Sequence, residues 1–344
     1  ANMNEKYMYR CLQLARLGEY YVAPNPMVGA VLVGHVVGDE QGEDIILGEG
    51  WHEQYGGPHA EPNCIRNAEM AHPEGIDYKS CTLYVSLEPC SHYGKTPPCA
   101  ELIIRKGIGH VVIGMLDPNP QVAGRGVKMM QEAGVEVKVG VLEEECRRLN
   151  KRFNCLHTNH RPYVILKWAQ TADGYIDVAR DSGTPLVIST PLTKQLVHQQ
   201  RAENMAIMVG TRTVLLDNPR LLNTRWSGRS PIRVTLDRHG VLSRDSRIFS
   251  DEAPTIVYRE NTDWQYILSD LANRNVHSIL VEGGAILLQH ILDSGLYDEV
   301  HVEVSKYSLP QVDGQIVGGV AAPNYVFSTS PTIIDGNKIY VEYR

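Results

Sequence analysis

The sequence predicts an α/β protein of two domains. Its 344 residues are enough for two hydrophobic cores of ordinary size. Strand-like and helix-like segments alternate in both halves, which is typical of sheets whose neighbouring strands run mostly parallel. The polar segment Thr158-Asn159-His160-Arg161-Pro162 interrupts this alternation. We therefore place the boundary within 150–160 and expect domains over 1–150 and 151–344.

The first half is predicted to be an α/β sandwich. Apolar residues at helical spacing (Met8, Cys11, Leu12, Ala15) indicate a helix over 5–17 that ends at Gly18. The segments that follow predict, in order, a strand over 27–33, a helix over 60–71, a strand over 82–87, a helix over 100–106, a strand over 111–114, a helix over 128–133 and a strand over 135–139. A charged helix over 143–153 closes this half.

The second half repeats the alternation. It begins with a strand over 163–168, followed by the hairpin-type turn Asp173-Gly174. The later segments predict helices over 192–201 and 267–274, and strands over 206–209, 232–236, 255–258, 278–281, 300–304 and 339–343. The last two strands are expected to close the second sheet.

Composition limits the class of protein. The formal net charge is −7, from 33 basic and 40 acidic residues, which argues against a general nucleic-acid binder. Seven cysteines, an odd number in a chain too large to need disulfides, favour reduced thiols and a cytoplasmic location. We expect no signal peptide, because no basic start precedes an apolar core, and no membrane span, because the apolar runs are too short.

Three potential metal ligands stand out in the first half: His59, Cys90 and Cys99. One imidazole and two thiols suit Zn²⁺, and three protein ligands leave a fourth position for water, as in catalytic zinc sites. Glu61, two residues after His59, is close enough to exchange protons with that water. Zinc deaminases, which replace an exocyclic amine by oxygen, use this combination.

The spacing of the two cysteines is unusual for such a site. The common pattern is Pro-Cys-x-x-Cys, whereas eight residues separate Cys90 from Cys99 here. The intervening segment is rich in loop-forming residues, so the chain can leave the metal and return to it. Within it, Lys95 supplies a cation and Thr96 a hydroxyl beside the proposed site. A ribose phosphate on the substrate would account for both.

A structural zinc site is the main alternative, since His92 or Cys64 could complete a closed set of four ligands. Such a site has no use for Glu61 in the His-x-Glu position or for Pro89 directly before Cys90. A deaminase acting on tRNA is a further alternative, which the acidic balance of the chain disfavours.

The motifs together resemble a known family, the bifunctional riboflavin-biosynthesis proteins, in which a pyrimidine deaminase is fused to a reductase. The similar segments cover nearly the whole chain: Asn25-Pro26-Met27-Val28-Gly29, 52–61, 88–99, Asp117-Pro118-Asn119-Pro120, Gly124-Arg125-Gly126, Lys167, Asp173-Gly174, 209–219 and Glu282-Gly283-Gly284. The resemblance implies a cytidine-deaminase-like α/β/α sandwich followed by a dihydrofolate-reductase-like α/β domain. It also implies Zn²⁺ and NADPH as cofactors.

For the first domain, the resemblance implies loss of the 2-amino group from a 2,5-diamino-pyrimidinone that carries ribosylamine phosphate. Glu61 would take a proton from the zinc-bound water and deliver protons to the ring nitrogen and the leaving amine. The residues expected to hold the pyrimidine and the ribose phosphate are Asn25, His52, Lys95, Thr96, Asp117 and Asn119. Taken singly, each of these also fits an ordinary turn or a solvated loop.

For the second domain, the residues alone show only short glycine turns, Gly210-Thr211 and Gly283-Gly284, at strand ends. The resemblance implies NADPH-dependent reduction of the ribosyl group to a ribityl chain. Lys167 or Asp217 would assist the sugar chemistry, with Arg225 and Glu282 around the substrate. The residues expected at the cofactor are Thr171, Ser189, Gly210, Thr213, Asn218, Gly283 and Gly284.

The sequence therefore predicts a cytoplasmic, bifunctional enzyme that acts on a small pyrimidine ribosyl phosphate and forms a homo-oligomer. No nucleic-acid or membrane partner is expected. Two alternatives remain open: a deaminase whose reductase-like half is only a scaffold, and a binding module with structural zinc.

Overall fold

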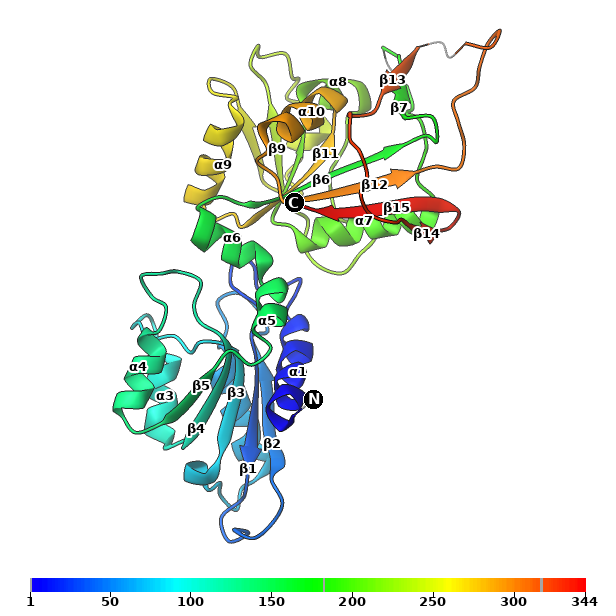
Figure 1. Ribbon diagram of the computed structural model, residues 1–344. Helices are drawn as coiled ribbons and strands as arrows, with labels where there is room; N and C mark the ends of the chain where they lie inside the picture. Colours follow the sequence, from blue (N-terminus) through cyan, green and yellow to red (C-terminus); the bar gives the residue numbers. More distant parts are fainter. Residues whose placement is uncertain (1, 182, 316–317) are drawn as a thin grey trace. The chain divides into compact units, whose positions relative to one another are not determined.

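The computed structural model describes residues 2–181, 183–315 and 318–344. The chain divides into two compact units, Ala1–Asn159 and His160–Arg344 (Figure 1). The helix over Lys151–Asn159 thus belongs to the first unit. Over the described ranges, no helix is both long and apolar enough to cross a membrane.

A five-stranded sheet forms the centre of the first unit, in the order β2-β1-β3-β4-β5. β1 pairs antiparallel with β2 and β3, whereas β3, β4 and β5 run parallel. β1 is buried along its whole length, as expected of a strand covered on both faces. The strands are Gly29–Gly34 (β1), Ile45–Trp51 (β2), Thr82–Leu87 (β3), His110–Met115 (β4) and Glu136–Val139 (β5).

Helices cover both faces of this sheet (Figure 1). α1 begins with a capping box between Asn2 and Glu5, which satisfies exposed backbone N–H groups of the first turn. One layer consists of Met3–Arg16 (α1) and Glu143–Leu149 (α5), and the other of Ala60–Ala71 (α2), Cys99–Lys106 (α3) and Arg125–Glu132 (α4), with a short 3-10 helix at Tyr78–Ser80. This is the α/β/α sandwich that the resemblance implies.

The sequence pattern missed β2, because this strand contains Gly48 and Gly50. Both glycines lie against α2, and a Cβ at residue 50 would be only 2.3 Å from the backbone nitrogen of Cys64. Strand and helix therefore approach each other at a distance that only glycine permits.

The predicted helix over 143–153 is two helices in the structure, α5 and Lys151–Asn159 (α6). Asn150 separates them, and its buried side chain bonds both backbone groups of Met27. Met27 N donates to Asn150 Oδ1 (2.8 Å), and Asn150 Nδ2 donates to Met27 O (2.8 Å). These two bonds hold the break between the helices against the start of β1.

An eight-stranded sheet forms the centre of the second unit, in the order β10-β9-β8-β11-β6-β12-β15-β14. The strands from β10 to β12 run parallel, and β15 and β14 add antiparallel strands at one edge. The bounds are Tyr163–Gln170 (β6), Ala206–Val209 (β8), Ile232–Leu236 (β9), Thr255–Tyr258 (β10), Ser278–Gly283 (β11), Glu299–Val304 (β12), Thr332–Ile334 (β14) and Asn337–Tyr343 (β15). A separate two-stranded sheet joins Tyr175–Val178 (β7) to Gly319–Ala321 (β13).

The helices of the second unit connect its parallel strands, in the dihydrofolate-reductase-like α/β arrangement expected from the resemblance. They are Pro191–Glu203 (α7), Thr211–Asp217 (α8), Trp264–Asn273 (α9) and Ala285–Ser294 (α10), with a 3-10 helix at Arg247–Phe249. α7 and α9 overlap the helices predicted over 192–201 and 267–274, whereas α8 and α10 follow glycines that predicted only turns.

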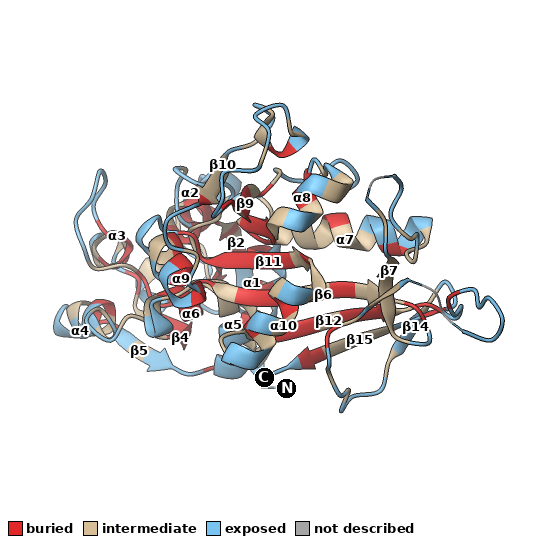
Figure 2. Ribbon diagram, turned by 90° about the horizontal axis from the view of Figure 1, so that it is seen from above, coloured by how far each residue is buried: buried red, intermediate tan, exposed pale blue. Residues whose placement is uncertain are grey.

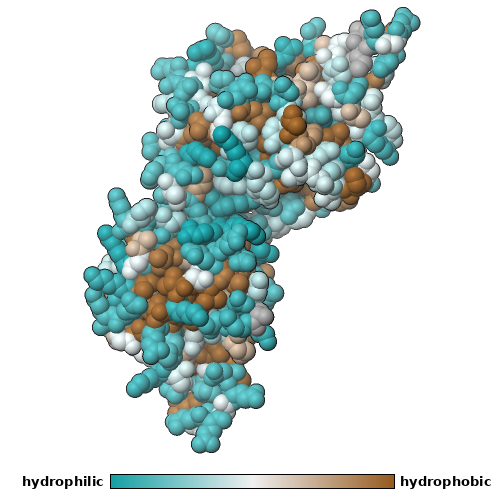
Figure 3. Space-filling view, viewed as in Figure 1, coloured by the Kyte–Doolittle hydropathy of each residue, from teal (hydrophilic) through white to brown (hydrophobic). Residues whose placement is uncertain are grey.

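Each unit has its own hydrophobic core, built on the central strands and the inner faces of the helices. Figure 2 shows the buried residues along these strands and the exposed ones on loops and outer helix faces. In Figure 3, apolar side chains gather on one face of the first unit, within an otherwise largely hydrophilic surface.

Candidate active sites

His59, Cys90 and Cys99 lie together in the first unit. Their ligand atoms are all within 4.8 Å of one another, and His59 Nδ1 is 3.8 Å from Cys90 Sγ and 3.4 Å from Cys99 Sγ. A zinc ion bonded to each ligand at about 2.0–2.3 Å fits such separations. Within the part of the chain that the structure describes, no other group of His, Cys, Asp and Glu side chains could hold a metal in this way.

Local backbone structure positions these ligands. His59 is the N-cap of α2, Cys90 follows the end of β3, and Cys99 is the first residue of α3. The loop 91–98 is closed at its base, because Cys99 N donates to Cys90 Sγ (3.2 Å) and Ala100 N donates to Cys90 O (3.1 Å). Backbone N–H groups at a helix N-terminus also favour thiolate over thiol.

The pKa values of the two thiols are shifted in opposite directions. Cys99 donates a hydrogen bond to Cys90, which lowers the pKa of Cys90 to about 4 and raises the pKa of Cys99 well above its ordinary value. A lowered pKa favours the thiolate form of Cys90, which is the form that binds zinc.

Neither candidate for a fourth protein ligand joins the cluster. Cys64 is buried and donates to the Gly48 carbonyl (3.4 Å), while His92 is exposed on the loop 91–98. The three donors fit zinc with one coordination position left for water, which is the arrangement of a catalytic rather than a structural site.

Glu61 lies beside the cluster in the first turn of α2. Its side chain is 3% exposed, and its carboxyl contacts the Cys99 thiol. Burial raises the pKa of Glu61 above its ordinary value, because the ionised form loses hydration there. A carboxyl with a raised pKa is suited to accept and return protons near neutral pH.

Asn25 and His52 form a hydrogen-bonded pair next to His59. His52 Nδ1 lies 2.9 Å from the Pro58 carbonyl, which can only accept, so the ring proton is on Nδ1. Nε2 then accepts from the Asn25 amide at 3.1 Å. Burial lowers the pKa of His52, which keeps its imidazole neutral, and its ring lies 5.6 Å from that of His59 in an edge-to-face arrangement.

Glu88 organises the loop that carries Asp117 and Asn119, a role that the sequence pattern did not predict. The carboxylate is buried and accepts backbone N–H bonds from Asp117 (3.1 Å), Gly124 (3.0 Å) and Val127 (3.1 Å). Asp117 Oδ1 in turn accepts from Asn119 N (2.9 Å). Because Glu88 lies two residues before Cys90, it ties this loop to the end of β3 that carries a proposed zinc ligand. Burial raises the pKa of Asp117.

Lys95 and Thr96 lie at the outer end of the loop 91–98, where both side chains are exposed. No described residue forms an ion pair with the Lys95 ammonium. The cation is therefore accessible to an anionic group from solution.

In the second unit, the glycine turns meet at the carboxyl ends of two neighbouring parallel strands. Gly210 follows β8, Gly283 ends β11, and Gly210 N donates to Gly283 O (3.3 Å). Gly284 has φ +67° and leads into α10. The Thr213 hydroxyl lies close to Gly283 and Gly284. A Cβ added at residue 283 would be 3.3 Å from Thr213 Oγ1, and a Cβ added at residue 284 would be 3.7 Å from it. Such strand ends are where open α/β sheets bind nucleotides.

A polar cluster lies on one face of this sheet. Lys167 is half-buried on β6, and Glu282 on β11 accepts from Arg201 of α7 through Nε (3.1 Å) and Nη2 (2.9 Å). Ser189 Oγ, just before α7, donates to Glu303 Oε2 (3.1 Å).

Arg201 and Glu303 were not among the predicted site residues. The polar residues Glu299, His301 and Glu303 alternate along β12 with valines. A period of two places them on one face of the strand, and this signal in the sequence could have identified Glu303.

Asp217, the last residue of α8, pairs with Arg180, which also bonds Asp177 (3.0 Å). The one guanidinium thus bridges the two carboxylates. Arg180 had not been predicted, because nothing in its local sequence distinguishes it from a solvated arginine.

Thr171 and Asn218 use their polar side-chain atoms to bind the backbone. Thr171 Oγ1 accepts from Tyr175 N (3.0 Å) within the turn after β6. Asn218 Oδ1 accepts from Arg247 N (2.7 Å). In this structure both residues therefore shape loops.

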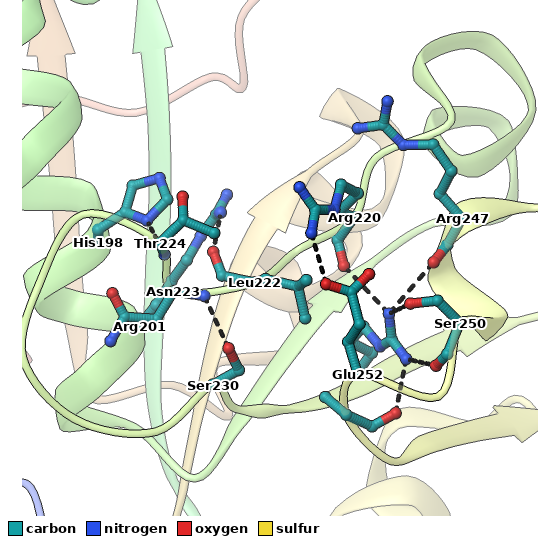
Figure 4. A network of polar contacts seen from close by, with 12 residues as sticks. His198, Arg201, Arg220, Leu222, Asn223, Thr224, Ser230, Arg247, Ser250 and Glu252 are labelled. Carbon is teal, nitrogen blue, oxygen red and sulfur yellow. Dashed lines mark hydrogen bonds and ion pairs between the residues drawn. The ribbon is translucent and has the colours of Figure 1, made fainter.

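Arg225 is exposed. The segment just before it, at Leu222 and Thr224, is bonded to His198 and Arg201 of α7 (Figure 4). Arg201 Nη1 donates to Leu222 O (2.9 Å), and Thr224 N donates to His198 Nδ1 (3.0 Å). His198 must be neutral to accept there, and burial together with the charge of Arg201 lowers its pKa to about 4. The Arg225 loop is thus linked through Arg201 to Glu282.

Two family models match the chain. The model described as the cytidine and deoxycytidylate deaminase zinc-binding region matches residues 1–115, and the RibD C-terminal domain matches residues 162–325.

Several characterised proteins are similar over nearly the whole chain. The riboflavin biosynthesis protein RibD of Synechocystis sp. is 38% identical over 94% of this chain and 88% of its own length, and that of Escherichia coli is 36% identical over 88% and 87%. A crystal structure from Thermotoga maritima, named as a diaminohydroxyphosphoribosylaminopyrimidine deaminase/5-amino-6-(5-phosphoribosylamino)uracil reductase, has a TM-score of 0.82 at 38% identity and 98% coverage of both chains. RibD of Acinetobacter baumannii has a TM-score of 0.84 at 30% identity, again over 98% of both chains.

Proposed function

This chain belongs to the RibD family of riboflavin-biosynthesis proteins, and on that premise we propose that its two polar clusters are a deaminase site and a reductase site. The protein is a bifunctional enzyme of riboflavin biosynthesis. It hydrolytically deaminates 2,5-diamino-6-ribosylamino-4(3H)-pyrimidinone 5′-phosphate and then reduces the ribosyl group to ribityl. A deaminase with a non-catalytic second half is not favoured, because the reductase family model matches that half.

The deaminase assignment depends above all on one observation, the His59, Cys90 and Cys99 cluster with the buried Glu61 beside it. We assign the first three as zinc ligands. When bound there, zinc supplies Lewis-acid activation of a water molecule. Glu61 accepts a proton from that water and returns protons to the ring nitrogen and to the amine, which leaves as ammonia.

The remaining residues of the first site are assigned to substrate binding. The Asn25–His52 pair lies next to His59, and the Glu88-supported loop presents Asp117 and Asn119. The exposed cation of Lys95, with the hydroxyl of Thr96 beside it, suits the phosphate of the substrate.

For the reductase we propose NADPH as cofactor, which supplies the hydride when bound. Gly210, Gly283, Gly284 and Thr213 provide the close backbone approach that a phosphate group needs. The expected contacts of Thr171, Ser189 and Asn218 with cofactor, and of Arg225 and Glu282 with substrate, remain proposals.

Lys167 is the better candidate for the proton donor in the reduction. As the sugar ring opens, the C1–O4 bond breaks and O4 needs a proton. NADPH, when bound, would supply the hydride to C1 of the resulting protonated imine. Asp217 is already paired with Arg180, whereas among the described residues no hydrogen bond or ion pair occupies the Lys167 amine.

A coupled assay tests this function directly. Purified protein, the diaminopyrimidinone ribosyl phosphate and NADPH are mixed, and ammonia and NADPH absorbance are followed together. We expect ammonia release followed by oxidation of NADPH. Ammonia release without NADPH oxidation would refute the reductase assignment alone, and absence of both would refute the assignment of each site.

We also propose a cytoplasmic homo-oligomer. The seven free cysteines suit a reducing compartment, and the apolar face of the first unit in Figure 3 suits self-association. Analytical ultracentrifugation of the purified chain should show a species larger than the 38.4 kDa monomer.

A further inference from the structure

Glu303 is a buried carboxylate to which the proposed function gives no role. Its side chain is 5% exposed. Oε2 accepts a hydrogen bond from Ser189 Oγ (3.1 Å), but Oε1 has no hydrogen-bond partner among the described residues. Burying a carboxylate with one oxygen that accepts no hydrogen bond lowers the stability of the fold, unless a cation lies nearby.

The cation on the same face of the sheet is Lys167. β12 and β6 pair in parallel, with His301 opposite Lys167 and Glu303 opposite Ala169. Glu303 and Lys167 therefore point to the same face of the sheet, on neighbouring strands and two positions apart in register. Over the described ranges, no hydrogen bond or ion pair fixes the Lys167 ammonium.

The other polar groups around Lys167 already have partners of their own. Glu303 is therefore the carboxylate that can balance the charge of Lys167. Glu282, on β11, already accepts two hydrogen bonds from Arg201 of α7, and the Arg201 charge opposes protonation of Lys167. His301, on β12, has its Nδ1 3.0 Å from Gln200 Nε2 of α7 and its Nε2 3.3 Å from Glu299 Oε1. Burial lowers the pKa of Lys167 below its ordinary value, and the carboxylates of Glu282 and Glu303 oppose that shift.

We propose that Glu303 is a positioning residue of the reductase site, the counter-ion that holds Lys167 in its protonated form. The inference deepens the proposed function and depends on it for the role of Lys167 as proton donor. Ser189 fixes one carboxylate oxygen and leaves the other for the ammonium. In the reaction, a Lys167 N–H bond breaks and its proton goes to sugar O4 as the C1–O4 bond breaks. The bound cofactor would supply the hydride for C1, and solvent would reprotonate the Lys167 amine.

The test compares Glu303→Gln with Glu342→Gln in the full-length, zinc-loaded protein. Glu342 is a matched control: it is 3% exposed, accepts from a hydroxyl (Ser328 Oγ, 2.6 Å) and also has one oxygen without a partner among the described residues. It pairs with Val300, so it lies on the opposite face of the sheet from Glu303.

Two readouts are needed. Competitive acetylation over a range of pH, followed by mass spectrometry of the Lys167 peptide, measures the pKa of that amine without using activity. The pH profile of kcat/KM for reduction of the deaminated substrate measures it through catalysis. We expect E303Q to lower the pKa of Lys167, and to move the alkaline limb of the profile to lower pH, by about one pH unit. E342Q should change neither.

The outcomes separate the inference from the function on which it rests. An unchanged pKa of Lys167 in E303Q would overturn the counter-ion assignment. A lowered pKa with an unmoved alkaline limb would support the counter-ion and refute Lys167 as the proton donor. Glu303→Asp, which keeps the charge, should remain near the wild type. If the glutamine variant does not fold, Glu303→Asp against Glu303→Asn repeats the comparison of charge.

Discussion

Glu61 combines two properties that a structural zinc site does not require, namely burial and a position two residues after a proposed metal ligand. We predict that Glu61→Gln lowers kcat for ammonia release by at least about 10²-fold, because general acid–base transfer is lost. The amide has nearly the same shape, so bound zinc, measured by atomic absorption, should stay at the wild-type level. Undiminished ammonia release would disprove the role given to Glu61.

Glu88 acts through the backbone of the loop that it supports. In Glu88→Gln, an amide NH₂ would face at least one of the three N–H groups that the carboxylate now satisfies. We predict a loss of about 1–3 kcal/mol in the free energy of unfolding, measured with urea, and a higher KM for deamination. Glu144→Gln is the control, because its ion pair with Arg148 is exposed and should contribute less than about 1 kcal/mol. Equal effects in both variants would contradict the role of Glu88.

Single residues were predicted best from the sequence where the chemistry of the site allows only a few residue types. The structure brings together His59, Cys90 and Cys99, although the cysteine spacing departs from the common pattern. Glu88, Arg180 and Arg201 were missed because their partners are backbone groups or carboxylates brought near only by the tertiary fold.

Among the elements, β2 and α2 show how closely helix and sheet must approach to place the first site. At residue 50 a Cβ would lie 2.3 Å from Cys64 N and 2.8 Å from Ala60 O, and neither backbone atom can move without the helix. We predict that Gly50→Ala shifts α2, which carries His59 and Glu61. The expected loss is about 1–3 kcal/mol in the free energy of unfolding, with weaker zinc binding.

Urea unfolding and a zinc titration check this prediction. Gly94→Ala is the matched control, because no atom lies within 4 Å of its added Cβ. Its unfolding free energy should change by no more than about 0.5 kcal/mol. If Gly50→Ala were equally mild, the close contact between β2 and α2 would not be what positions the ligands.

The elements that sequence patterns located best are continuous apolar strands and long helices. The observed bounds of α2, β3, β8, β9 and β10 coincide with the predicted ranges. β2 was missed because its glycines resemble a turn, although packing against α2 is what requires them. α8 and α10 follow glycines that were interpreted only as turns, and the break at Asn150 depends on its bonds to Met27, far away in sequence.

At the scale of the whole molecule, each proposed site lies within one compact unit. The zinc ligands belong to Ala1–Asn159 and the reductase cluster to His160–Arg344, and each unit has its own core. We predict that a chelator abolishes ammonia release and leaves NADPH-dependent reduction of the deaminated substrate within about twofold of its initial rate, a change of under about 0.5 kcal/mol. Both rates are measured on the same sample, and added Zn²⁺ should restore the first. Parallel loss of both rates would show that the metal supports the fold of the entire chain.

The α/β class of both halves followed from the alternation of segments, because that alternation is a local property of the chain. The break in the pattern at 158–162 spans the division between the two units. The alternation could not predict the order of the strands in the second sheet. There β6 lies between β11 and β12, which come much later in the sequence.

The two hydrogen bonds at the base of the loop 91–98 join Cys90 to the backbone N–H groups of Cys99 and Ala100. Neither bond involves a side chain of the residues between the two cysteines. The length and composition of that stretch can therefore vary while the ligands remain in place. If Lys95 binds the phosphate of the substrate as proposed, the exposed tip is a recognition module that can be exchanged separately from the proposed zinc ligands. Grafting tips of other lengths onto this base is a route to deaminases with new specificity that leaves the reaction chemistry untouched.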